Sequence, residues 1–395
     1  MTNIHKNTCP AFFTDATTNS SGSYSPCTAL GGGAFKFLDQ TFKTTWLDSK
    51  LEDARQRSIT GEKLEMCNRC WTEEDLGHTS ERNYLIKDLP LGLDYTNPNY
   101  YLSGPRHLNI KVSNICNLRC RTCQSLDSYL YHIEGEYYEK KNNLTRTAYT
   151  MEKFKKHFTD EQLDELFDFS TNLERIELYG GEPFLDNQIP KFLERLIDAG
   201  LSKNIEFSVS TNCTHTLTDQ WRRILTNFAN VIINISVDGI GPHFTYMRHP
   251  GDWAVAERNI QSFFELEHTN TQITVQPVIT VSALNVYNIQ EIFDYFAPYN
   301  VQPFLILVQW PSYYCVNVLP KTCQEVIKER LQSNPNFNPI INLMSTTPRR
   351  FDSKSTLTPW EEFKFWTKEK DEYRKENFIQ TFNEFGEHLI RLDVW

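Results

Sequence analysis

The sequence predicts an α/β fold in which six strand–helix units form a partial (β/α)6 barrel, and three observations support this prediction. Six apolar, strand-like segments alternate with helix-like segments between residues 105 and 311. Four of these strands are followed directly by Cys, Gly, Asn or Asp, at the strand ends where barrels place their active sites. Six units are fewer than a closed eight-stranded barrel contains, so we expect an open, TIM-like barrel.

The predicted strands share short apolar runs, and the first shows the alternation of a strand with one buried face. They occupy residues 108–112, 173–178, 205–210, 231–237, 273–281 and 304–310. Helices are predicted between them. Thr159 and Gln162 form a capping-box pattern. The segment 189–199 has apolar residues at helical spacing and ends before Gly200.

The chain divides into three predicted regions. Residues 1–104 form a cysteine-rich segment with an irregular, Gly/Ser/Thr-rich beginning, and residues 105–311 form the partial barrel. Residues 312–395 form a connecting segment followed by helices, in which Phe378, Phe382 and Phe385 recur at helical spacing. We expect this aromatic stripe to pack in a core.

Composition restricts the function classes. The 395 residues carry a net charge of -10, which disfavours binding to nucleic acid or to an anionic membrane. The sequence starts without a signal-length apolar stretch and contains no apolar run long enough to cross a bilayer, so we expect a cytoplasmic protein. In that reducing compartment the ten cysteines are not expected to form a disulfide framework, and those that cluster are expected to bind metal.

Three of these cysteines, Cys116, Cys120 and Cys123, lie within eight residues directly after the first predicted strand. Iron–sulfur clusters are usually held by four cysteine thiolates. Three local thiolates would therefore leave one iron open to a substrate or cofactor, as catalytic zinc sites leave one position open. The alternative is a zinc site completed by a His or Asp ligand.

The pattern Cys-x3-Cys-x2-Cys after the first barrel strand resembles the signature of the radical S-adenosylmethionine (SAM) superfamily. The resemblance implies a [4Fe–4S] cluster on these three cysteines whose open iron binds SAM. It implies reductive cleavage of SAM to a 5′-deoxyadenosyl radical that activates a C–H bond, with an electron donor such as flavodoxin or ferredoxin. Many members have an aromatic residue before the third cysteine, whereas this chain has Thr122.

Further segments extend the resemblance to SAM binding. Gly180, Gly181 and Glu182 resemble the GGEP segment that receives the amino group of SAM, and glycine suits a close approach of ligand to backbone. Ser210 and Asn212 resemble the segment after strand three that contacts the ribose hydroxyls.

The later strands complete the expected SAM site. Ser236 and Asp238 resemble the end of strand four, and Arg248 resembles an arginine that pairs with the SAM carboxylate. Val278 is expected to lie against the adenine.

Four cysteines precede the barrel: Cys9, Cys27, Cys67 and Cys70. Their CxxC stretch resembles the cysteine-rich part of the SPASM and twitch subfamilies, which carry auxiliary clusters and often modify peptides or proteins. SPASM modules more often follow the barrel. The resemblance implies a second iron–sulfur cluster here, with structural zinc as the alternative. The isolated Cys213, Cys315 and Cys323 are expected to be inert thiols.

Two other functions are compatible with clustered cysteines. A zinc-dependent barrel hydrolase would need a His or carboxylate to complete its site, and the strand ends lack a His pair at ligand spacing. A noncatalytic, metal-stabilised binding module would leave the polar residues at the strand ends unexplained. The sequence therefore favours a radical SAM enzyme with an unknown substrate, possible substrates including a peptide or protein.

Overall fold

The computed structural model describes residues 4–18, 24–30, 41–75, 79–142, 158–348 and 356–395. Its contacts divide the chain into two compact units, which we call the first and second units. The first unit contains Met1–Ile115, Ala148–Ser210 and Leu217–Ile232, and the second contains Cys116–Thr147, Thr211–Thr216 and Ile233–Trp395. The boundaries at 104/105 and 311/312 remain predictions.

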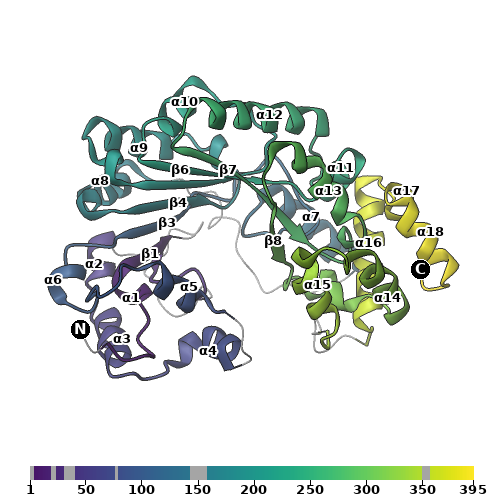
Figure 1. Ribbon diagram of the computed structural model, residues 1–395, viewed down its shortest axis with the longest axis horizontal. Coiled ribbons are helices and arrows are strands. Elements are labelled where there is room, and N and C mark those ends of the chain that lie inside the picture. The colour runs from purple at the N-terminus through teal and green to yellow at the C-terminus, as the bar shows by residue number, and fades with distance from the viewer. Residues whose placement is uncertain (1–3, 19–23, 31–40, 76–78, 143–157, 349–355) are drawn as a thin grey trace. The chain divides into compact units, whose positions relative to one another are not determined.

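The strands form a mostly parallel sheet in the order β2-β1-β3-β4-β5-β6-β7-β8, which confirms the α/β fold class (Figure 1). The bounds are β1 (Asp15–Thr18), β2 (Tyr24–Ser25), β3 (His107–Lys111), β4 (Arg175–Tyr179), β5 (Glu206–Thr211), β6 (Asn230–Ser236), β7 (Ile273–Val281) and β8 (Phe304–Leu307). Strands β3 to β8 correspond to the six predicted strands. In addition, β1 pairs in parallel with β3, and β2 pairs antiparallel with β1. Sequence reasoning missed β1 because its residues, DATT, show no apolar alternation.

The first unit contains nine α-helices among the described residues. They are α1 (Ala11–Thr14), α2 (Phe42–Trp46), α3 (Ser49–Ile59), α4 (Asn68–Asp75), α5 (Glu81–Asp88), α6 (Pro98–Tyr101), α8 (Asp160–Asp168), α9 (Ile189–Asp198) and α10 (Asp219–Leu225). The predicted capping box of Thr159 and Gln162 begins α8. Helix α9 buries Phe192, Leu193 and Leu196 completely, as its apolar spacing predicts.

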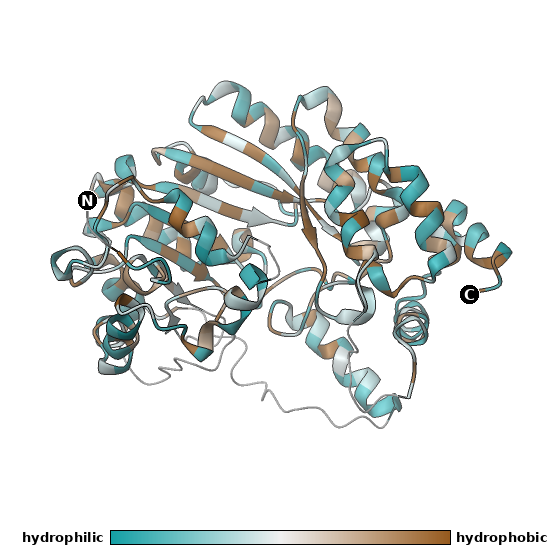
Figure 2. Ribbon diagram, turned by 60° about the horizontal axis from the view of Figure 1, so that its bottom comes forward, coloured by the Kyte–Doolittle hydropathy of each residue, from teal (hydrophilic) through white to brown (hydrophobic). Residues whose placement is uncertain are grey.

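In the second unit, one of the helices, α12, packs against β7. The helices of this unit are α7 (Tyr129–Asn142), α11 (Pro242–Met247), α12 (Trp253–Thr269), α13 (Ile289–Phe296), α14 (Lys321–Leu331), α15 (Asn338–Met344), α16 (Pro359–Arg374), α17 (Phe378–Thr381) and α18 (Asn383–Arg391). The aromatic stripe of Phe378, Phe382 and Phe385 is buried, as predicted. Figure 2 shows apolar residues along the strands and in bands that alternate with polar residues on the helices. None of the helices in the described part of the chain has the length and apolar character that crossing a bilayer requires.

Candidate active site

The three-cysteine loop begins at Cys116, where the chain enters the second unit, and its middle cysteine faces a predicted SAM-binding arginine. The Arg119 amide donates to the His249 carbonyl at 2.7 Å, and the Arg121 amide donates to the Met247 carbonyl at 2.8 Å. These two bonds pair the segments 119–121 and 247–249 in opposite directions. The middle residues therefore lie opposite each other, and an Arg248 guanidinium nitrogen (Nη1) is 4.0 Å from Cys120 Sγ.

Arg248 is held by a buried carboxylate. Its Nη2 lies 2.8 Å from Asp238 Oδ2, and Asp238 Oδ1 accepts a hydrogen bond from the Thr280 amide at 2.7 Å. Burial raises the pKa of Asp238, and the charge of Arg248 opposes this rise. Both predicted SAM contacts therefore lie together beside Cys120, and an arginine so fixed has the donor geometry for a carboxylate.

The turn after β5 is attached to the first cysteine of the loop. Asn212 Nδ2 lies 3.7 Å from Cys116 Sγ and 2.9 Å from Asn117 Oδ1, and Asn117 donates to Thr214 Oγ1 at 2.8 Å. The Thr214 amide in turn donates to Asn212 Oδ1 at 2.9 Å. Cys213 has a φ of 63°, the left-handed conformation that reverses the chain between Asn212 and Thr214.

Sequence reasoning singled out Asn212 but missed the roles of Asn117 and Thr214. The sequence did contain a signal for Thr214. In an Asx-turn the Asn side chain accepts a hydrogen bond from the backbone amide two residues later, and Thr214 lies two residues after Asn212. For Asn117, a polar residue directly after Cys116, position alone was the signal. The structure places Asn212 against the cysteine loop, and a ribose contact remains a prediction.

In the first unit, the predicted glycine turn contacts the residue directly before Cys116. Gly180 and Gly181 have φ values of 77° and 57°, which favour glycine. A Cβ atom on Gly181 would lie 2.5 Å from the Ile115 carbonyl oxygen, which accepts the Glu182 amide at 2.8 Å. Glu182 is buried, and its carboxylate accepts the Phe184 amide at 3.2 Å. The turn therefore needs glycine to approach the chain that enters the cysteine loop.

The remaining predicted SAM contacts lie at strand ends or within strands. Ser210 is half-buried near the end of β5 in the first unit. In the second unit, Ser236 is half-buried at the end of β6, and Val278 is half-buried in β7. The Val278 carbonyl accepts the Val237 amide at 3.0 Å. Contacts of Ser210, Ser236 and Val278 with SAM remain predictions.

The three thiols fit the donor set of a cluster with one open iron. Cys116, Cys120 and Cys123 are half-buried and form no disulfide. Burial raises the pKa of Cys120 and of Cys123, so bound cations would be needed to keep both sulfurs as thiolates at neutral pH. No group of three or more His, Cys, Asp or Glu side chains in the described residues is close enough to hold a single metal ion.

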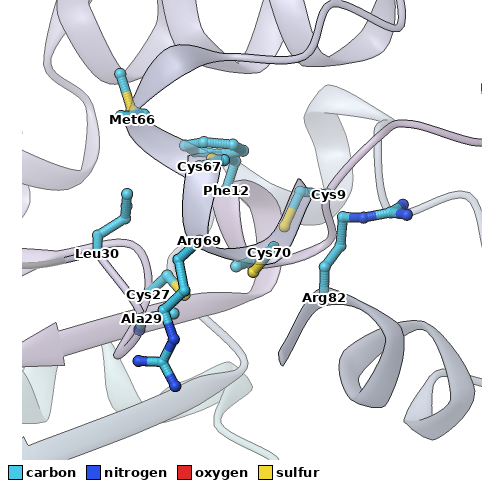
Figure 3. A pocket seen from close by; sticks show the side chains of 11 residues that line it. Cys9, Phe12, Cys27, Ala29, Leu30, Met66, Cys67, Arg69, Cys70 and Arg82 are labelled. Atoms are coloured by element: carbon cyan, nitrogen blue, oxygen red, sulfur yellow. The ribbon is translucent and has the colours of Figure 1, made fainter. Parts of the chain in front are cut away.

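A second cysteine set gathers in the first unit. Cys9, Cys27, Cys67 and Cys70 all line one pocket, although they come from distant positions (Figure 3). Cys9 precedes α1, and Cys27 follows β2. Cys67 ends the short 3-10 helix Glu65–Cys67, and Cys70 lies in α4. In Figure 3 the sulfurs of Cys9, Cys27 and Cys70 are directed toward one another.

The surrounding fold holds these four cysteines in place. The Cys9 amide donates to Ser58 Oγ at 3.0 Å. Arg82, which also lines the pocket, forms an ion pair with Glu74 at 2.6 Å. Its guanidinium lies 4.8 Å from the centre of the Trp71 ring.

Burial raises the pKa of all four pocket thiols. The pKa rises to about 12 for Cys27 and to about 11 for Cys67. Four thiols around one pocket are the donor set of a fully protein-ligated cluster or of structural zinc. Cys213, Cys315 and Cys323 are buried elsewhere, and their inertness stays a prediction.

Residues 110–287 match the model of the radical SAM superfamily. The uncharacterized protein MJ0907 of Methanocaldococcus jannaschii is 27% identical over 140 residues, which are 35% of this chain and 41% of that protein. Native anSMEcpe with bound AdoMet (SAM) has a TM-score of 0.40 at 18% identity and covers 57% of this chain and 59% of its own. Streptococcus suis SuiB bound to the precursor peptide SuiA has a TM-score of 0.36 at 14% identity, covering 68% and 58% respectively.

The chain thus spans less than two thirds of the length of each of these proteins. The match to the superfamily model begins within β3 and extends past β7, so it includes the three-cysteine loop, the glycine turn and Arg248. Residues 110–287 are thus similar to a radical SAM domain.

Proposed function

We propose that the chain binds a [4Fe–4S] cluster through Cys116, Cys120 and Cys123 and uses it to cleave SAM reductively for C–H activation. The observation that supports this most directly is the contact of Gly181 and Glu182 with the Ile115 carbonyl. It ties the turn that would receive the methionine part of SAM to the residue directly before the first cluster cysteine.

The chain's own residues would bind and orient SAM. Arg248, fixed by Asp238, would donate to the SAM carboxylate, and the backbone beside Gly181 would meet its amino group. Ser210 and Asn212 would face the ribose, and Val278 the adenine. When bound, the cluster supplies the electron that splits SAM into methionine and a 5′-deoxyadenosyl radical.

We also propose that Cys9, Cys27, Cys67 and Cys70 bind a second iron–sulfur cluster. Four thiols line a pocket that also contains the apolar side chains of Phe12, Leu30 and Met66. A site with four protein ligands is complete, so this cluster would transfer electrons rather than bind SAM.

The proposed substrate is a peptide or protein, and the proposed electron donor is a flavodoxin or ferredoxin. The resemblance of the cysteine-rich segment to SPASM and twitch proteins supports a peptide. The net charge of -10 suits a basic peptide better than a nucleic acid.

The first experiment tests the radical chemistry. The full chain is purified anaerobically, and 5′-deoxyadenosine is measured after addition of SAM and dithionite. We expect a brown protein that releases 5′-deoxyadenosine, and a colourless zinc protein without cleavage would contradict the proposal. A variant lacking the thiols of Cys116, Cys120 and Cys123 should release none and keep about four irons. Cys323→Ala, remote in sequence and buried in α14, is the matched control and should behave as wild type.

A second experiment tests the substrate class. Peptide and small-molecule fractions are prepared from deuterium-grown cells and incubated separately with enzyme, SAM and reductant. If a peptide loses a hydrogen atom to the radical, deuterium should enter 5′-deoxyadenosine with the peptide fraction. Deuterium transfer with the small-molecule fraction alone would contradict a peptide substrate.

A further inference from the structure

Two buried basic side chains of α16 reach the cysteine loop from the C-terminal region of the chain. Lys370 and Arg374 are one helical turn apart and therefore lie on one face of the helix. Lys370 Nζ donates to the Arg121 carbonyl at 3.1 Å, and Arg374 Nη2 donates to the Arg119 carbonyl at 2.6 Å. Their exposed fractions are 1% and 7%, so neither contact is a surface contact.

These bonds complete the backbone pairing around Cys120. The amides of Arg119 and Arg121 already donate to the carbonyls of His249 and Met247. With the two bonds from α16, the amide and the carbonyl on each side of Cys120 are satisfied. The middle cysteine is thus fixed from both sides, by the segment that carries Arg248 and by α16.

Carboxylates hold the arginines of this network together, whereas Lys370 Nζ donates to the Tyr131 hydroxyl at 2.9 Å. Glu134 of α7 accepts hydrogen bonds from Arg374 at 3.0 and 3.1 Å and lies 3.4 Å from Arg119 Nε. The fully buried guanidinium of Arg121 pairs with the carboxylates of Asp371 and Glu376.

Packing of α16 does not by itself require such a network. Buried ion pairs contribute less to stability than apolar side chains of similar volume, and breaking one leaves a buried charge without its partner. The other face of α16 carries Lys368, which is exposed. A role that needs fixed loop geometry accounts for these buried basic side chains better than packing does.

We propose that Lys370 and Arg374 are positioning residues for the SAM-binding cluster. By holding the carbonyls on both sides of Cys120, they set its distance from Cys116 and Cys123 and keep it opposite Arg248. Helix α16 is then part of the cluster site although it lies about 250 residues away in sequence. This inference rests on the proposed function.

The test uses the anaerobic full chain and follows the electron paramagnetic resonance signal of the reduced cluster while SAM is added. Only a cluster with an open iron changes its signal with SAM, so the second cluster does not interfere. The variants are Lys370→Met, which keeps the apolar stem, and Arg374→Lys, which keeps a charge beside Glu134. Lys368→Met is the matched control on the exposed face. Melting temperatures of the metal-free proteins are measured in parallel.

We expect the dissociation constant of SAM to rise about tenfold or more in both variants, with altered g values, and to stay unchanged in Lys368→Met. A wild-type dissociation constant and signal in both variants would overturn the inference alone, whatever the melting temperatures. If Lys370→Met does not fold, Arg374→Lys alone tests the inference, by the same tenfold rise in the dissociation constant of SAM. A wild-type protein without any SAM-dependent signal would overturn the proposed function and this inference with it.

Discussion

The two cysteine sets of this chain are built in opposite ways. The three-cysteine loop takes all its thiols from eight consecutive residues, and hydrogen bonds to distant backbone fix it. The four-cysteine pocket takes its thiols from positions spread between residues 9 and 70, and the fold of the first unit brings them together. In the loop, the spacing of the thiols follows from the sequence, and the fold brings charged side chains next to them. In the pocket, the spacing of the thiols is itself determined by the fold.

The way each cysteine set is built agrees with the function proposed for it. Three thiolates leave an iron open, so the loop needs neighbours that bind a cofactor, and Arg248 and Asp238 lie beside Cys120. Four thiolates leave no position open, so the pocket needs only enclosure, which Phe12 and Leu30 help to provide. A site that binds a ligand is therefore expected to depend on charges, and a site that only stores electrons is expected to depend on metal for its fold.

The largest expected effect tests the dependence of the pocket on metal. Cys70→Ala should lose about four irons per chain, because the second cluster then lacks one ligand. Structural metals contribute on the order of 10 kcal/mol to folding in small metal-bound domains, so residues 4–18 and 49–75 should lose protection from amide hydrogen exchange. The second unit, including α16, should keep its protection, and cleavage of SAM should persist.

Loss of SAM cleavage together with loss of exchange protection in β7 would contradict this separation of the two sites. Cys323→Ala, which removes a buried thiol from α14, is the control for loss of a cysteine side chain. It should keep both the irons and the exchange protection of wild type.

The cysteine loop and the strands could be predicted from local sequence patterns, whereas the long-range contacts could not. The spacing of Cys116, Cys120 and Cys123 and the apolar runs of β3 to β8 lie within short windows. The pairing of Arg248 with Asp238 joins neighbouring segments and was only partly expected. Lys370 lies in a region that the sequence predicts only as a connecting segment followed by helices, and nothing in its sequence neighbourhood indicates a contact with residue 121. Such contacts are set by tertiary packing, which single-sequence patterns do not record.

The next largest expected effect is the loss of stability when the arginine of an ion pair is removed at each of the two sites. Arg248→Met should lower the free energy of unfolding of the metal-free chain by about 3–5 kcal/mol, because Asp238 stays buried without its cation. Arg82→Met in the pocket should lower it by only about 1–3 kcal/mol, because Glu74 is partly exposed and keeps a hydrogen bond from Ser80. Urea unfolding followed by tryptophan fluorescence measures both.

Adding Asp238→Asn to Arg248→Met should recover part of the lost stability, since it removes the uncompensated charge. Equal destabilisation by Arg248→Met and Arg82→Met would contradict the proposed difference between the two sites. It would mean that the loop depends on buried charge no more than the pocket does.

The smallest effect concerns the glycine turn, and the chain supplies its own control. Gly200 has a φ of 75°, and no atom lies within 4 Å of an added Cβ, so Gly200→Ala should cost only the strain of a left-handed residue, about 1–2 kcal/mol. Gly181→Ala adds a contact of 2.5 Å to the Ile115 carbonyl and should cost about 1–3 kcal/mol more. Because the backbone next to Cys116 must shift to relieve that contact, only Gly181→Ala should also weaken SAM binding. Equal SAM affinity in the two variants would show that the turn and the cysteine loop are not coupled, and the geometry of the loop would then depend on its other contacts, among them those of Arg248, Asn212 and α16.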